Sequence, residues 1–404
     1  MYRFSTSIFV FVVCLTVAFA QPSSSPGASA GPLSPKTRDP LTNRAFERFY
    51  NLDYDHAIQD FQAVLDKNPK DPFAVNHLMS AVLIRELYRM GAMNTGEYAG
   101  DSFVGQVHHS ADPKMKDWIK QLAARAEAIE EQRLKDNPKD INALYARGVT
   151  RAQFSLYTAL VERAWFSALR NAVGARHDHE RVLELDPHFT DAKLVVGAHN
   201  YVTGSLPWGV KAAVAMVGLS GSKEKGIEYL YDAANGGGET SNDAKVVLMV
   251  FLRREHRYDE ALRLAAPLAA AYPANGLFVL EEANLLRAKG DNQAAAQKYR
   301  EVWQAGKEGR YPGMHYEMAA IGLGDLLRSQ KDYAGAAQAY DLVNQASQPD
   351  SELLQKANLA AGEMYDLMKQ RDLAVKKYQA VIAANNSTPP AEQARKHMKD
   401  AYSE

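Results

Sequence analysis

Glycine-rich segments are where phosphate chemistry would be expected, because backbone N–H groups in such loops can converge on an anion. Residues 218–223 (GLSGSK) combine glycine, serine and lysine. A phosphate-binding loop needs the order GxxxxGK[ST] after a strand, and here the order differs and no strand pattern precedes it. We expect a loop that begins a helix at Lys223, with Ser220 or Ser222 as its N-cap, and no nucleotide cofactor. Gly236-Gly237-Gly238 follows a helical pattern and predicts a flexible stop.

Histidine clusters are the next candidates, as metal ligands. His108-His109 and His177-x-His179 are the only ones. Adjacent or alternate helical positions point in different directions, whereas a helical zinc site uses positions i and i+4. Glu180 beside His179 does not complete HExxH. No metal-ligating residue is predicted, although a site assembled from distant histidines stays open.

Nucleophiles and acid/base pairs are equally scarce. The only cysteine, Cys14, lies in the opening apolar segment, so a processed chain would hold no thiol for a disulfide, a metal or catalysis. No GxSxG elbow occurs. The pairs Glu130-Glu131 and Glu281-Glu282 lie on amphipathic helical patterns and are expected to be solvated. The sequence predicts no catalytic residue and no cofactor, and an enzyme whose site is assembled from distant repeats stays open.

Aromatic residues in two breaks of the helical pattern are the candidate binding residues. Residues 91–113 (GAMNTGEYAGDSFVGQVHHSADP) interrupt the pattern for longer than an ordinary inter-helix loop. They contain Tyr98 and Phe103, and a second bend runs from Tyr201 to Trp208. These four side chains could line a groove or pocket for a partner or ligand. The alternative is a structural plug or part of the core.

The N-terminus has the pattern of a secretory signal peptide over residues 1–20. Arg3 supplies positive charge, residues 8–17 (IFVFVVCLTV) are apolar, and Ala18-Phe19-Ala20 forms a small-x-small site. The apolar run is short of the roughly 20 residues that span a bilayer. We expect an exported protein, periplasmic or secreted, cleaved after Ala20, with no stable membrane span afterwards; a retained anchor is the alternative. Residues 21–38 (QPSSSPGASAGPLSPKTR) read as a disordered linker.

Bulk charge argues against a nucleic-acid partner. The 404 residues include 47 basic and 48 acidic side chains, a formal net charge of -1. No basic run stands out, so the electrostatic pattern of a nucleic-acid-binding protein is missing. The hydrophobic fraction of 46% is that of an ordinary foldable protein.

A recurring apolar spacing sets the architecture. Five segments have an alanine, an apolar residue four positions later, and another three positions after that. Offsets of four and three place the three side chains on one helical face. The segments are Ala57-Phe61-Val64, Ala261-Ala265-Leu268, Ala295-Tyr299-Val302, Ala336-Tyr340-Val343 and Ala374-Tyr378-Val381.

Proline and glycine mark the ends and partners of these helices. A proline five residues after the last apolar position ends the helix in the first two segments. Glycines in the preceding helices are expected to allow close helix–helix contact. These further structural positions are Pro69, Pro273, Gly148, Gly197, Gly324 and Gly362.

This pattern resembles the tetratricopeptide repeat, a helix-turn-helix unit of about 34 residues. Ala261 and Ala295 are 34 residues apart. The block over residues 176–275 is similar to a family of uncharacterised exported bacterial repeat proteins. The resemblance implies an all-α fold: an α-solenoid of helix-turn-helix repeats in a right-handed superhelix, with irregular long helices in the N-terminal half.

The expected organisation follows from where the pattern is regular. We expect a degenerate repeat region over residues 39–240, with an inserted loop near 91–113. Regular repeats are expected over 241–388, and a capping helix over 389–404.

Such stacks present a concave face made by the first helix of each pair, suited to extended peptides or proteins. We therefore expect a non-catalytic protein–protein interaction scaffold of the cell envelope or extracellular space. The alternative is a periplasmic small-molecule or lipid carrier with a pocket in the irregular middle region. Neither the partner's identity nor the oligomeric state follows from the sequence.

Overall fold

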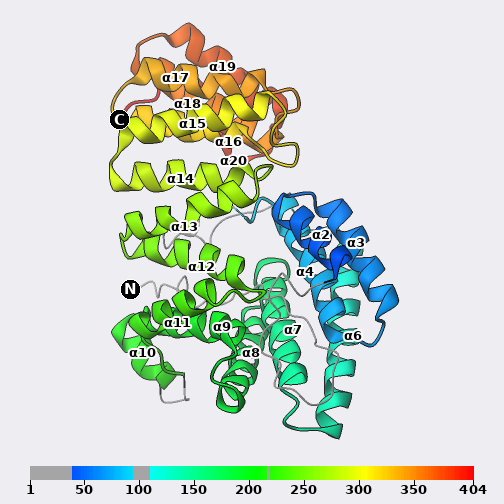
Figure 1. Ribbon diagram of the computed structural model, residues 1–404. Helices are drawn as coiled ribbons and strands as arrows, with labels where there is room; N and C mark the ends of the chain where they lie inside the picture. Colours follow the sequence, from blue (N-terminus) through cyan, green and yellow to red (C-terminus); the bar gives the residue numbers. More distant parts are fainter. Residues whose placement is uncertain (1–38, 94–109, 216–218) are drawn as a thin grey trace. The chain divides into compact units, whose positions relative to one another are not determined.

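The protein is described by a computed structural model that covers residues 39–93, 110–215 and 219–404 (Figure 1). Every regular element in these ranges is a helix, so the predicted all-α class is confirmed. The predicted signal peptide and linker, together with Tyr98 and Phe103, lie outside the described residues. The chain divides into two compact units, Met1–Leu264 and Ala265–Glu404, and each is treated by itself below.

The boundary between the two units falls inside one helix, α13 (Tyr258–Ala271). The helices of the first unit are α2 (Pro40–Tyr50), α3 (Tyr54–Lys67), α4 (Pro72–Arg89), α6 (Pro113–Asp136), α7 (Ile141–Leu160), α8 (Trp165–Leu185), η3 (Thr190–Ala192), α9 (Lys193–Gly204), α10 (Trp208–Ala215), α11 (Lys223–Asn235) and α12 (Ser241–Arg254). Those of the second are α14 (Gly276–Lys289), α15 (Asn292–Lys307), α16 (Glu317–Ser329), α17 (Tyr333–Asp341), η4 (Leu342–Gln345), α18 (Ser351–Leu367), α19 (Arg371–Ala384) and α20 (Pro389–Lys399). None of these helices is both long and apolar enough to cross a bilayer.

Asp-Pro pairs determine where three helices of the first unit begin. The carboxylate of Asp39 accepts from the backbone N–H of Leu41 at 3.0 Å, and that of Asp112 accepts from Lys114 at 2.8 Å. Asp71 caps α4 in the same way. Proline follows each aspartate in the first turn, where its missing N–H costs no hydrogen bond. Capping and a preset φ angle thus make these starts a local property of the sequence.

The first unit contains the long, irregular helices that the sequence predicts. α6, α7 and α8 have 24, 20 and 21 residues. α7 and α8 are separate helices, and the turn between them places Arg163 in the left-handed region at φ 55°. α4 packs against α3, α6 and α7, and 15 of its 18 residues are buried. A helix buried nearly all round lacks the usual polar face.

The second unit consists of consecutive helix pairs. α14 packs on α15, α16 on α17 and α18 on α19, and α20 covers α18 and α19. The repeat alanines Ala295, Ala336 and Ala374 are fully buried, as are Ala57 and Ala261 in the first unit. This helix-turn-helix arrangement is the tetratricopeptide-like fold that the spacing predicts. The handedness of a superhelix stays a prediction.

In the pairs α16–α17 and α18–α19, a tyrosine of the second helix packs on a glycine of the first helix and donates to an aspartate near its end. An added Cβ on Gly324 would lie 2.4 Å from the ring of Tyr340, and one on Gly362 would lie 2.5 Å from the ring of Tyr378. The Tyr340 hydroxyl donates to Asp325 at 2.7 Å. The contact therefore needs the absence of a side chain on the first helix and the presence of a ring on the second.

The capping helix is shorter than predicted, because contacts from other helices take its C-terminal hydrogen bonds. α20 ends at Lys399, and residues 401–404 are not helical. The Arg371 guanidinium donates to the carbonyl oxygens of His397 and Met398 at 2.7 and 2.8 Å. The backbone N–H of Tyr402 donates to Asp366 at 2.8 Å.

Substituting Gly362→Ala should destabilise the protein by roughly 1–3 kcal/mol, because the new methyl group overpacks against the Tyr378 ring. Gly209→Ala is the matched control, since a Cβ there meets nothing within 4 Å. Removing a helical glycine should leave stability unchanged or raise it by up to about 1 kcal/mol. Urea unfolding measures both, and equal stability of the two variants would contradict the proposed role of the glycine.

Candidate partner-binding site

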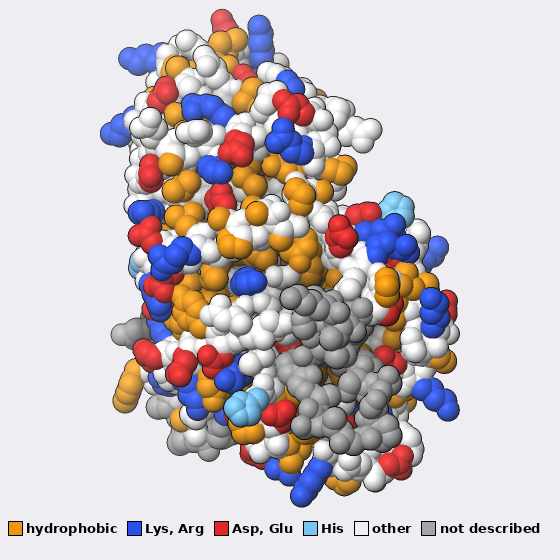
Figure 2. Space-filling view, in the orientation of Figure 1, with side chains coloured by type: hydrophobic (Ala, Val, Ile, Leu, Met, Phe, Trp, Pro, Cys, Tyr) orange, Lys and Arg blue, Asp and Glu red, His pale blue; other side chains and the backbone are white. Residues whose placement is uncertain are grey.

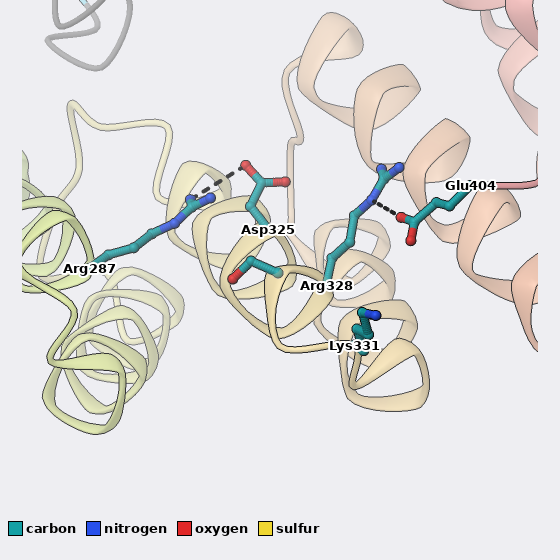
Figure 3. A pocket seen from close by; sticks show the side chains of 6 residues that line it. Arg287, Asp325, Arg328, Lys331 and Glu404 are labelled. Carbon is teal, nitrogen blue, oxygen red and sulfur yellow. Dashed lines mark ion pairs between the residues drawn. The ribbon is translucent and has the colours of Figure 1, made fainter.

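An open cleft in the second unit gathers charged side chains at the ends of two first helices (Figure 3). It has a volume of about 370 Å³. Figure 3 shows Arg287 of α14 directed toward Asp325 of α16, and Arg328 of α16 directed toward Glu404. The lining residues are Arg287, Asp325, Arg328, Ser329, Lys331 and Glu404.

The cations of this cleft gather where first helices end. Arg287 lies in the last turn of α14 and Arg328 in the last turn of α16. The final carbonyl groups of a helix carry partial negative charge, which favours basic residues there. Lys331 follows in the turn to α17, at φ 62°. Stacking of the pairs brings these locally favoured cations into one cleft.

The carboxylate of Asp325 is held by the repeat tyrosine behind it. It accepts from the Tyr340 hydroxyl at 2.7 Å and lies 3.7 Å from the guanidinium of Arg287. Burial, and then the neighbouring Asp325, raise the pKa of Tyr340 well above its usual range, so the phenol keeps its proton and remains a donor. A core residue thus orients a cleft residue.

Arg328 is the most connected side chain of the cleft. It donates to Glu363 of α18 at 2.8 Å and to the Tyr402 hydroxyl at 2.7 Å. Its Nε lies 3.5 Å from Glu404 Oε1, and its guanidinium lies over the Tyr402 ring, 5.4 Å from the centroid. Burial raises the pKa of Glu363, partly offset by Arg328. Arg328 therefore joins the cleft floor to residues 401–404.

Residues 401–404 are not helical and pack beside the cleft, which Glu404 lines. Asp366 receives the Tyr402 backbone N–H and also the Tyr378 hydroxyl, each at 2.8 Å. The Tyr333 hydroxyl donates to Glu404 Oε2 at 3.1 Å. Groups of α16, α17 and α18 thus bind the backbone N–H and the phenol of Tyr402 and the carboxylate of Glu404.

On the face shown in Figure 2, basic and acidic side chains of the second unit are interspersed, with hydrophobic side chains between them. Mixed surface charge of this kind gives little long-range steering. Recognition here depends on short-range contacts.

A second cleft, of about 520 Å³, lies in the first unit beside α11. Its cations are committed to ion pairs: Lys223 Nζ lies 2.7 Å from Glu255, and Arg257 forms a forked pair with Glu260 at 2.6 and 2.7 Å. Hydrogen bonds from Arg257 and then Tyr231 lower the pKa of Glu260 to about 2. The lining residues are Lys223, Glu224, Ile227, Glu228, Tyr231, Asp232, Glu255 and Arg257.

The two described aromatic candidates do not share a site. Tyr201 is buried, stacks on Phe251 with centroids 3.9 Å apart, and donates to Glu255 at 2.8 Å. It supports the second cleft from behind and is not among its lining residues. Trp208 is 87% exposed at the start of α10. Ser222 is the N-cap of α11, as predicted.

Several titratable groups are buried in the first unit, which bears on the enzyme alternative. The prediction that Glu130 and Glu281 are solvated is wrong, since both are buried. Adjacent helical positions face different directions, so one member of each glutamate pair points into the core. Burial raises the pKa of Glu130 to about 8. Its partner is the Thr150 hydroxyl, 2.7 Å away, which also lies 2.8 Å from Asn76 Oδ1.

Asp191 has a structural explanation. It receives the backbone N–H and the hydroxyl of Thr240 at 3.1 and 2.7 Å, and so caps α12 from a distance in sequence. Burial raises its pKa to about 6. α11 ends at Asn235 with Gly236 as its C-cap, as the three glycines predict, whereas Gly238 packs closely, since an added Cβ would lie 2.2 Å from the Asp191 carboxylate. Close approach of the chain to Asp191 requires glycine there.

The buried histidines are also packed against structural partners. His179 bonds to the carbonyl of Ala175 at 2.7 Å, and a Cβ on Gly148 would lie 2.3 Å from its ring. Burial lowers the pKa of His179 to about 4. Burial, and then Arg176, lower that of His199 to about 3. Neither histidine lines either cleft, and within the described ranges no three His, Cys, Asp or Glu side chains form a metal-binding group.

Comparison with known proteins adds no family. No protein family model matches the chain. The solved structures similar to it include a human IFIT1 dimer with m7Gppp-AAAA (TM-score 0.39, 13% identity, 89% of this chain and 86% of that one). Others are the APC/C hetero-tetramer Cut9-Hcn1 (0.44, 15%, 90% and 56%) and PilF of Pseudomonas aeruginosa (0.36, 15%, 62% and 97%). With TM-scores below 0.5, these similarities say nothing of this chain's function.

Sequence reasoning missed the residues of the second-unit cleft. Arg287 and Arg328 are 41 residues apart, as are Tyr299 and Tyr340, so the two arginines occupy equivalent repeat positions. Aligning the repeats on their tyrosines would have found them. Glu404 carries no such signal, because its place in the cleft depends on the path of the chain after α20.

Substituting Glu130→Gln should change how stability depends on pH. Between about pH 4.5 and 8 the folded protein keeps a proton on Glu130 that the unfolded chain has released, so wild-type stability falls as the pH rises. Glutamine removes this term. The variant should gain on the order of 2–4 kcal/mol relative to wild type between pH 5 and 9. Urea unfolding across this range measures it.

The exposed neighbour provides the control for this experiment. Glu131→Gln should leave the stability difference from wild type nearly constant over the same pH range, because Glu131 faces solvent. If the difference in unfolding free energy between Glu130→Gln and wild type also stays constant with pH, the Glu130 carboxyl ionises freely in the folded protein.

Proposed function

We propose that this protein is a non-catalytic scaffold that binds an extended segment of a partner protein in the cleft of its second unit. The observation that carries the proposal is the packing of residues 401–404 beside that cleft, with Glu404 among its lining residues. Helix-pair stacks bury their cores between neighbours and leave the ends and faces of the first helices open for binding.

The lining of both clefts favours a protein partner over the carrier alternative. Small-molecule pockets are predominantly apolar and enclose most of the ligand. Both clefts here are open and lined mainly by charged side chains. Charged side chains with backbone-accepting carboxylates, such as Asp366, suit the polar groups of an extended peptide.

The enzyme alternative lacks a supporting site in the part of the chain that the structure describes. Shifted pKa values in a cleft would mark a catalytic candidate. The strongly shifted groups Glu130, Asp191, His179 and His199 are instead buried among structural partners. A scaffold needs none of them to react.

The proposed location is outside the cytoplasm, in the periplasm or secreted. It rests on the apolar run over residues 8–17 and the small-x-small site at Ala18-Phe19-Ala20. The neutral charge balance and the loss of Cys14 with the signal fit this location without requiring it.

Processing can be tested directly. Protein recovered from the envelope or medium of the producing cell should begin at Gln21, as measured by intact mass and N-terminal sequencing. Replacing Ala18 and Ala20 by aspartate should block cleavage, because the site requires small residues. Recovery of the unprocessed chain from the cytoplasm would contradict the proposal.

Partner binding can be tested by affinity capture with matched charge variants. Wild-type protein should recover a specific protein from the producer's envelope extract. Arg287→Glu with Lys331→Glu should reduce recovery at least about tenfold, because it reverses two cleft cations. Lys356→Glu with Lys376→Glu changes the same charge at exposed positions of α18 and α19 and should recover the partner normally. Quantitative mass spectrometry measures all three.

Two results of the capture experiment would reject the scaffold. One is equal recovery by the cleft variant and by wild type, which would remove the cleft from the mechanism. The other is co-purification of a lipid or metabolite without any specific protein, which would favour the carrier.

A further inference from the structure

We propose that residues 401–404 are an internal competitor for the partner, and that the partner presents an acidic, tyrosine-containing extended segment that displaces them. This inference rests on the proposed function and deepens it by naming the chemistry of the ligand. The segment reads Ala-Tyr-Ser-Glu, so the predicted motif is tyrosine followed two residues later by a carboxylate.

The contacts of the segment are those that another chain could supply. The backbone N–H of Tyr402 donates to Asp366, and any residue except proline has this group. The Tyr402 ring lies under the Arg328 guanidinium, which also donates to its hydroxyl. Stacking with a guanidinium selects an aromatic side chain. The tyrosine position is therefore the specific one.

The carboxylate requirement follows from the charge of the cleft. Arg287, Arg328 and Lys331 face two carboxylates, Asp325 and Glu404. Arg328 also pairs with Glu363, so when Glu404 leaves, three cations remain with two carboxylates. Asp325 is already committed to the Tyr340 hydroxyl. The emptied cleft therefore favours a ligand that brings negative charge to replace Glu404.

The Glu404 end of the segment is held weakly enough to be displaced. Ala401, Ser403 and Glu404 are exposed, and Tyr402 is half-buried. Glu404 contacts Arg328 at 3.5 Å and Tyr333 at 3.1 Å, and its side chain is 42% exposed. Exposed ion pairs contribute little in water. The advantage of the segment is its covalent attachment, which gives it an effective concentration of about millimolar.

The test compares peptide binding to the full chain with and without the competitor. The probe is a fluorescein-labelled hexapeptide with the sequence of residues 399–404 (KDAYSE), amidated at its C-terminus so that only side-chain carboxylates are charged. Fluorescence anisotropy should show at least about tenfold tighter binding to Tyr402→Ala with Glu404→Ala than to wild type, because wild type must first release its own segment.

Variants of the cleft and of the probe establish where and how the peptide binds. Adding Arg287→Glu and Lys331→Glu to the tail variant should abolish binding. A probe with the tyrosine replaced by alanine, or with the last glutamate replaced by lysine, should also bind at least about tenfold more weakly. Thermal unfolding checks that each variant remains folded. If the double alanine variant unfolds, Tyr402→Phe with Glu404→Gln retains the packing and should bind with intermediate affinity.

The possible outcomes separate this inference from the proposed function. Equal probe binding by wild type and tail variant, or none by either, overturns the internal competitor even where capture remains cleft-dependent and the scaffold stands. Peptide binding together with cleft-independent capture would reject the scaffold assignment instead. If wild type forms dimers with rising concentration and loses them in the tail variant, the segment binds a second copy, and the partner motif proposed here is wrong.

Discussion

The structure depends on one repeated contact, in which a tyrosine of the second helix of a pair packs where the first helix has no side chain. Gly324 and Gly362 leave space for the rings of Tyr340 and Tyr378. The buried hydroxyl of each ring needs an acceptor, because an unpaired polar group in the core is costly. Asp325 and Asp366 provide it near the ends of α16 and α18. The packing of the core thus places a carboxylate at the edge of the surface in these two pairs.

These two carboxylates connect the repeat core to binding. Asp325 lines the charged cleft, and Asp366 holds the backbone of residues 401–404. Arg328 lies in the last turn of α16, where basic residues are favoured. Arg371 lies at the start of α19, and both arginines contact the same C-terminal region. The proposed binding would therefore use groups that the repeat needs for its own stability. A scaffold can arise in this way from the regular pattern alone.

The first unit follows a different rule. α4 is buried on nearly all sides, so its neighbours must supply partners for internal polar groups. Glu130, Thr150 and Asn76 form one such contact across three helices, and Asp191 caps α12 from outside it. Burial raises the pKa values of Glu130 and Asp191, so these shifts need no catalytic role to explain them. The core of the irregular region is thus held together in part by buried polar contacts. Its two aromatic candidates differ in exposure, because Tyr201 is buried and Trp208 is exposed.

The sequence by itself determined the helical class, the Asp-Pro helix starts and the buried faces of the repeats, because caps and helical periodicity act within a few residues. Only the tertiary structure decided which glutamate of a pair faces inward, since neighbouring positions on a helix differ by orientation and not by composition. It also decided the cleft. Arg287, Arg328 and Glu404 meet through stacking and through the path of the chain after α20, and spacing along the sequence does not encode contacts between distant segments.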